Sequence, residues 1–216
     1  MKILSKLPKS NPRLHLELIK NSWIPMKEPK NLTSAILLST PLMIVAAIIS
    51  IGVINIFSSI SLSDFGLTPD AISITINLSS IFWLILLLII HELLHLIFIP
   101  NFTKSEKTYV GFTLFGGFVI TEEEISKSRY IFITIAPFII ISIILPLILS
   151  AFGLLTTTLK FLIILNSMAS SVDILNLLLI FKQVPKNATL KSNGPNTYWK
   201  NIQMNKKYTE NEKHVI

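Results

Sequence analysis

Four long apolar stretches alternate with polar segments along the 216 residues of this chain. They cover residues 34–57, 78–99, 130–152 and 159–181. Each is longer than the about 20 helical residues that cross a hydrocarbon core. The pattern predicts an all-α membrane protein with four transmembrane helices, the first and third of which should be kinked by internal prolines.

The polar segments divide the rest of the chain. Residues 1–33 are basic and rich in proline, so we expect a cytoplasmic segment that follows the membrane surface and contains one short amphipathic helix around residues 14–23. Residues 34–182 should form the membrane domain. Residues 183–216 are polar, basic and without periodicity, which predicts a cytoplasmic tail that is partly disordered.

One loop, between the second and third spans, differs from the others. Its middle, residues 109–121 (YVGFTLFGGFVIT), is rich in aromatic and β-branched residues and contains three glycines. This composition favours a short β-hairpin or an edge strand over a further helix. Glu122, Glu123 and Glu124 come next and predict a solvated, acidic start to the third span. In the loop at residues 58–77, the sequence around Pro69 predicts a turn.

Composition supports the membrane assignment. Hydrophobic residues make up 51% of the chain and charged residues 14%, with a mean hydropathy of +0.64, whereas soluble domains carry about 25% charged residues. The formal net charge is +7, but the basic residues lie beside the apolar spans. There they indicate contacts to anionic lipid, and no nucleic-acid partner is needed.

The distribution of Lys and Arg predicts the orientation. Seven precede the first span, four lie between the second and third, and seven follow the fourth, whereas the other loops share only Lys160. By the positive-inside rule both termini should be cytoplasmic. Heavy use of Ile, Leu, Asn, Lys and Ser is typical of an AT-rich bacterial genome, so we expect a multi-pass protein of the bacterial cell membrane.

Candidate chemistry lies in the second span, which contains HELLH at residues 91–95. On a helix His91 and His95 share one face and can bind one cation, while Glu92 can act as general base. The chain has no cysteine, so His, Asp or Glu must hold any metal, and imidazoles suit zinc. About 0.003 matches to HExxH are expected by chance for this composition. The alternative is a pair of helix-packing histidines with Glu92 as partner.

A catalytic zinc usually has three protein ligands, and Asp173 is the best candidate for the third. Apart from Glu92 it is the only acidic residue in a predicted span. It lies eight residues before the end of the fourth span, as His91 does in the second, so both should lie about 12 Å from the cytoplasmic helix ends. The alternative is a hydrogen-bonded carboxylate that packs helices.

Other polar residues are weaker candidates. Asn166, Ser170 and Asn176 share a helical stripe with Asp173, where they could orient the ligands or substrate, or simply bond neighbouring helices. The remaining histidines, His15 and His214, lie in the tails. Trp23 and Tyr130 are expected to anchor the protein at the membrane interface.

Several motifs carry a family resemblance over about residues 20–182. They are IIHELLHLIFIP, WIPMKEPKN near Trp23, the GFTLFGG loop, APF at 136–138 and SSVD at 170–173. Together they resemble the putative zincin peptidase family of small bacterial membrane proteins. The arrangement is also similar to that of site-2 proteases, which implies His91, His95 and Asp173 as ligands and Glu92 as base. Unlike the site-2 motif NxxPxxxxDG, this aspartate has no glycine after it.

The sequence therefore predicts a zinc-dependent, membrane-embedded peptidase. Its substrates would be membrane or membrane-associated proteins, cut near the cytoplasmic face. The alternative function is a non-catalytic, metal-binding membrane protein that binds a partner transmembrane segment. A zinc transporter is less favoured, because a single site at one depth provides no relay of ligands across the bilayer.

Overall fold

The computed structural model describes residues 1–66, 71, 78–113 and 116–201. The turn predicted at Pro69 and the end of the tail lie outside these residues. The chain forms two compact units. Residues 30–95 and 135–175 make up the helical unit, and residues 1–29, 96–134 and 176–216 make up the sheet unit.

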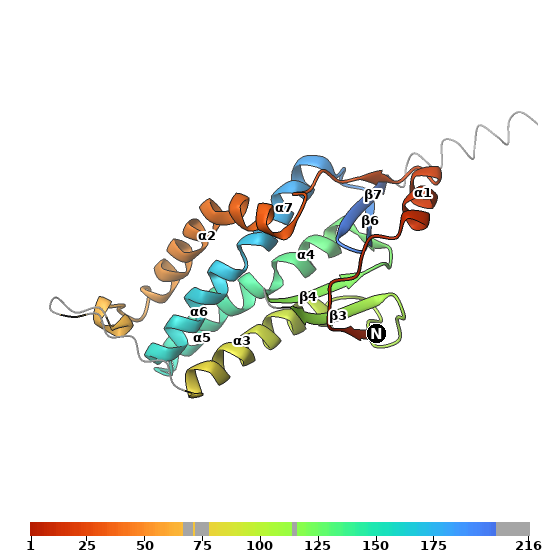
Figure 1. Ribbon diagram of the computed structural model, residues 1–216. Coiled ribbons are helices and arrows are strands. Elements are labelled where there is room, and N and C mark those ends of the chain that lie inside the picture. The colour runs from red at the N-terminus through yellow and green to blue at the C-terminus, as the bar shows by residue number, and fades with distance from the viewer. Residues whose placement is uncertain (67–70, 72–77, 114–115, 202–216) are drawn as a thin grey trace, which may run out of the picture. The chain divides into compact units, whose positions relative to one another are not determined.

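The four predicted spans are confirmed as helical segments, with ends that differ by a few residues (Figure 1). The candidate spans are Leu32–Ile54, Leu78–Ile97, Lys127–Ala151 and Thr157–Gln183, and their length and composition are compatible with a multi-pass membrane protein. The helices are α2 (Leu32–Ile54), α3 (Leu78–Ile97), α4 (Lys127–Pro137), α5 (Leu145–Ala151), α6 (Thr157–Ala169) and α7 (Ser171–Gln183), with a short 3₁₀ turn η1 (Leu62–Phe65).

Within the helical unit, α6 packs against α2. Small side chains make this possible, because Ser39, Ala46 and Ser50 of α2 are buried and lie on one face. The Ser171 hydroxyl donates to that of Ser39 at 3.3 Å. By contrast, only 11% of the apolar window of α3 is buried, against 44% in the third span. Most of α3 therefore remains available to lipid or to a partner.

The third span contains a π-helical segment rather than simple kinks. α4 ends at Pro137, and η2 (Phe138–Ile144) follows as a π helix before α5. The N–H of Leu145 donates to the carbonyl of Ile140, five residues earlier. Proline cannot donate a main-chain hydrogen bond, and Pro137 and Pro146 lie just outside the two ends of this segment.

The fourth span is interrupted, which its sequence did not predict. α6 ends at Ala169, and Ser170 lies between it and α7 with φ −68° and ψ 0°. Both the N–H and the hydroxyl of Ser170 donate to the carbonyl of Asn166. As a result Asp173 lies in the first turn of a new helix.

The predicted hairpin between the second and third spans is confirmed within a three-stranded sheet. β3 (Thr108–Thr113) pairs antiparallel with β4 (Gly116–Thr121), and β1 (Lys2–Leu4) pairs parallel with β3. β3 is thus the central strand. At Gly111 a β-carbon would lie 1.9 Å from the carbonyl oxygen of Leu4, so only glycine allows β1 to approach this closely.

A second sheet corrects the all-α prediction. Its antiparallel strands run in the order β2 (Ile24–Pro25), β7 (Asn196–Asn201), β6 (Ala188–Asn193) and β5 (Ile125–Ser126). The described residues are 56% helical and include seven strands in two sheets. Residues 188–201 are therefore a hairpin and not an unstructured tail. Glu122, Glu123 and Glu124 were predicted to start the third span, and this is also wrong. β5 follows them, and α4 begins only at Lys127.

The sheet unit has a core of its own. Met26 from the N-terminal segment, Ile180 and Val184 from the end of the fourth span, and Leu190 from β6 form one buried cluster. The predicted amphipathic helix is α1 (Pro12–Lys20), which packs Leu18 against Trp23 and Tyr198. Trp23 is only 6% exposed, so it is a core residue of this unit and not an interface anchor.

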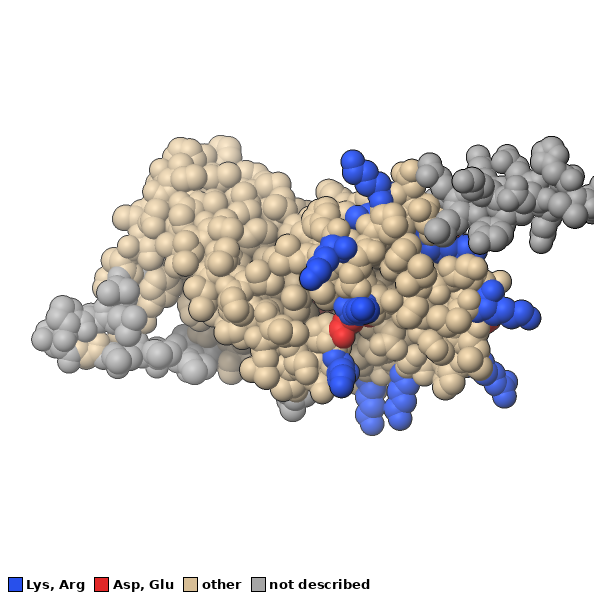
Figure 2. Space-filling model, turned by 90° about the horizontal axis from the view of Figure 1, so that it is seen from above, with Lys and Arg blue, Asp and Glu red and all other residues tan. Residues whose placement is uncertain are grey.

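Lys and Arg are concentrated in the sheet unit, since Lys30 and Lys160 alone belong to the helical unit. Figure 2 shows their side chains spread over the sheet unit. Most Lys and Arg residues therefore lie outside the four candidate spans. The cytoplasmic location of both termini stays a prediction.

Glu28 should make the sheet unit sensitive to pH. Its carboxylate accepts a hydrogen bond from the N–H of Thr197 at 2.8 Å, and burial raises its pKa to about 7. Because the folded pKa is raised, its contribution to stability is full below about pH 4.5 and is lost as the pH rises through 7. We expect protection factors of residues 188–201 in hydrogen exchange to fall by up to about 100-fold between pH 5 and 8.

Glu28→Gln keeps an acceptor for Thr197 and should remove most of this pH dependence. Glu17→Gln, at an exposed position of α1, is the matched control and should keep it. If the protection factors of Glu28→Gln depend on pH as those of the wild type do, another group causes the pH dependence.

Candidate metal centre

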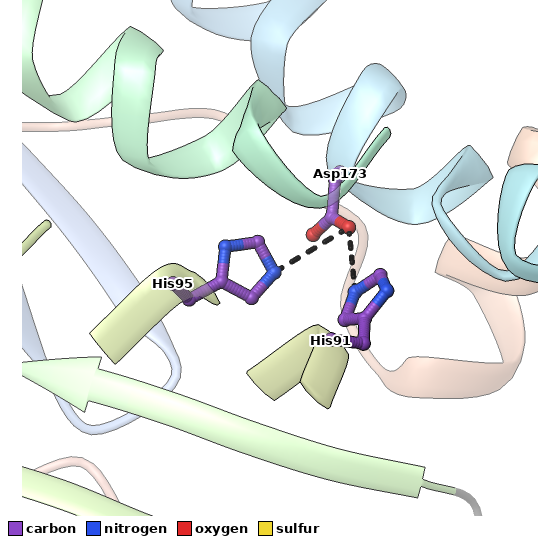
Figure 3. Close-up of side chains that lie close together, drawn as sticks. All are labelled: His91, His95 and Asp173. Carbon is purple, nitrogen blue, oxygen red and sulfur yellow. Dashed lines mark ion pairs between the residues drawn. The ribbon is translucent and has the colours of Figure 1, made fainter. Parts of the chain in front are cut away.

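Three side chains that metals commonly use as ligands meet inside the helical unit (Figure 3). His91 and His95 come from α3 and Asp173 from the first turn of α7. Asp173 Oδ2 lies 3.3 Å from His91 Nε2 and 3.6 Å from His95 Nε2. One ligand atom from each residue lies within 4.8 Å of the others.

Local structure explains this cluster. The i, i+4 spacing places both imidazoles on one face of α3, where their centroids lie 5.1 Å apart at an angle of 75°. The interruption at Ser170 starts α7 two residues before Asp173. His91 is buried, and the other two side chains are partly buried.

The three residues fit a zinc ion. Two ligand atoms bound at 2.0–2.2 Å in tetrahedral geometry lie about 3.3 Å apart, which is close to both nitrogen–oxygen distances given above. Two imidazoles and one carboxylate are also a ligand set that zinc accepts while one position stays open. The group could therefore hold a metal ion.

Glu92 follows His91 and is partly buried. It is not one of the three clustered residues, but it is close enough to interact electrostatically with His91, His95 and Asp173. This arrangement leaves the Glu92 carboxylate for a role other than that of ligand.

Asn166 connects the cluster to the third span. Its Oδ1 lies 2.9 Å from His91 Nδ1, and its Nδ2 donates to the carbonyl of Pro137 and to the hydroxyl of Ser142. Of the polar stripe predicted in the fourth span, Asn166 therefore contacts a proposed ligand, whereas the Ser170 hydroxyl bonds its own helix. Asn176 lies on the part of α7 that belongs to the sheet unit.

The sequence did not predict the contribution of Pro137 and Ser142. A signal was present, because Ser142 is a polar residue between two prolines in an apolar span. The remaining histidines lie elsewhere. His15 Nδ1 is 2.7 Å from the Tyr198 hydroxyl in the sheet unit, and His214 lies outside the described residues.

Fold and cluster together define a mostly helical protein with four candidate membrane spans and a candidate metal centre between the second and the fourth of them. Residues 84–189 match the model of a protein family described as putative zincin peptidase. This segment contains His91, Glu92, His95 and Asp173, so the predicted family resemblance is confirmed for the part of the chain that carries the centre. Among curated proteins and solved structures, no match was found.

Proposed function

We propose that this protein is a zinc-dependent, membrane-embedded peptidase that hydrolyses membrane or membrane-associated proteins near the cytoplasmic face. The observation that carries the proposal is the meeting of His91, His95 and Asp173 within a segment that matches a zincin family. Ionisable groups inside membrane spans are costly and usually serve a function. The arrangement also resembles that of site-2 proteases.

In this proposal His91 Nε2, His95 Nε2 and Asp173 Oδ2 would hold a zinc ion. Bound zinc would supply Lewis acidity, which activates water and polarises a peptide carbonyl. Glu92 accepts a proton from the attacking water and delivers it to the nitrogen of the cleaved peptide bond. Glu92 is partly buried, and in the lower dielectric of a protein interior the charge of a carboxylate acts more strongly on a nearby proton than in water.

The alternative is a metal-binding membrane protein without catalytic activity that binds a partner transmembrane segment. The exposure of α3 favours it, because residues 78–85 are exposed on all sides of this helix. In a bilayer such a surface can accept lipid or another helix. The two functions differ in whether peptide bonds are broken.

Zinc-dependent release of new protein termini tests the proposal. We expect the purified protein, reconstituted with solubilised bacterial membrane proteins, to generate new N-termini that mass spectrometry detects. Treatment with 1,10-phenanthroline should abolish them, and added zinc should restore them. If no terminus depends on zinc, the peptidase proposal is wrong and the binding protein is favoured.

A further inference from the structure

We propose that Asn166 is a positioning residue that fixes the tautomer of His91, and that through it the π segment η2 belongs to the metal centre. Asn166 is 1% exposed and Ser142 is fully buried. The inference rests on the metal-binding part of the proposed function. It does not depend on whether the protein cleaves peptides.

The partners of Asn166 determine which end of its amide faces His91. The carbonyl of Pro137 can only accept, and it lies 3.2 Å from Nδ2. The Ser142 hydroxyl donates its proton to the carbonyl of Ile163 at 3.3 Å, so its oxygen accepts from Nδ2 at 3.0 Å. Both partners require the NH₂ group, and Oδ1 is left for the imidazole.

This orientation determines the state of His91. Its Nδ1 lies 2.9 Å from Oδ1, and an amide oxygen can only accept, so Nδ1 must carry a proton. In the neutral imidazole Nε2 then has the free lone pair. Nε2 is the atom that lies 3.3 Å from Asp173, so the ring is prepared to bind a metal through this nitrogen.

The π helix allows the carbonyl of Pro137 and the hydroxyl of Ser142 to lie beside the side-chain amide of Asn166. Residues five apart, such as Pro137 and Ser142, lie about 140° apart around an α helix. In a π helix the i→i+5 hydrogen bond brings them over one another. Replacing η2 by regular α helix would therefore separate the two groups that orient Asn166.

Asn166 also differs in charge from the carboxylates that often orient zinc-bound histidines. As a neutral amide it orients the ring without adding a second negative charge to the centre. Asp173 remains the one carboxylate in the cluster, and each further charge inside a span would cost free energy.

Zinc affinity and histidine ¹⁵N chemical shifts test this inference in the full chain. We expect Asn166→Leu to weaken zinc binding by about 10- to 100-fold and, in the metal-free protein, to give His91 a mixture of tautomers. Asn166→Asp retains an oxygen toward Nδ1 and should keep the wild-type tautomer. Ser142→Ala should have a smaller effect, because Pro137 still accepts from Nδ2.

Asn176→Leu and Ser167→Ala are the matched controls. Ser167 is a buried serine of the same helix, and its hydroxyl donates within that helix to the carbonyl of Ile164. The shifts are recorded with and without zinc. Because zinc on Nε2 itself keeps the proton on Nδ1, the metal-free spectra decide: a purely wild-type tautomer in metal-free Asn166→Leu would overturn the inference. A wild type that binds zinc and shows the Asn166-dependent tautomer, but releases no zinc-dependent termini, would overturn the peptidase proposal alone.

Discussion

Glu92→Gln is expected to reduce peptide hydrolysis by about 10²- to 10⁴-fold, the usual contribution of a general base, and to leave the zinc content unchanged. Glutamine has almost the same shape but cannot accept a proton. Glu92 is not one of the clustered residues, so the metal should remain. Turnover is measured from the new termini described above, and zinc by elemental analysis.

Glu106→Gln is the matched control, because Glu106 is exposed in the loop after α3 and its replacement should leave turnover unchanged. Full hydrolysis by Glu92→Gln would exclude Glu92 as the base. The binding protein would be favoured if the wild type binds zinc without cleaving any protein, and if cells with Glu92→Gln have the same phenotype as cells with the wild type.

Asp173→Ala is expected to remove the zinc from the purified protein. The substitution leaves two imidazoles, whereas zinc sites in proteins normally have at least three protein ligands. Asp173→Asn should give the same loss while it preserves the shape of the side chain. Elemental analysis gives the zinc content of each variant.

Asn176→Ala, three residues further along α7, controls for the loss of a polar side chain in the same helix and should retain zinc. A full complement of zinc in Asp173→Ala would mean that another residue is the third ligand. His15 and His214 are then the remaining histidines to test.

The spans and the meeting of the three clustered residues were predictable for the same physical reason. A bilayer requires long apolar helices, and it makes ionisable groups inside them rare. With few such groups, the equal depths of His91 and Asp173 were enough to predict that they would meet. Their role as metal ligands stays a prediction.

The second sheet could not be predicted in this way. β6 (ATLKSN) alternates apolar and polar residues only over its first four positions, which is short for a strand signal, and β7 (NTYWKN) has no regular alternation. Leu190 and Tyr198 are nevertheless almost completely buried, because each packs against other parts of the sheet unit. β1 and β2 contain three and two residues, too few for a pattern. Trp23 was misinterpreted because an aromatic residue shortly before a span resembles an interface anchor.

The pairing of β2 with β7 has a consequence for how the protein is made. Ile24 is the partner of Trp199, and all four spans lie between them in the sequence. The ribosome must therefore synthesise and release every span before β2 can find its neighbour. Until then β2 has no strand partner. The sheet unit can therefore be completed only after the last helix has been made.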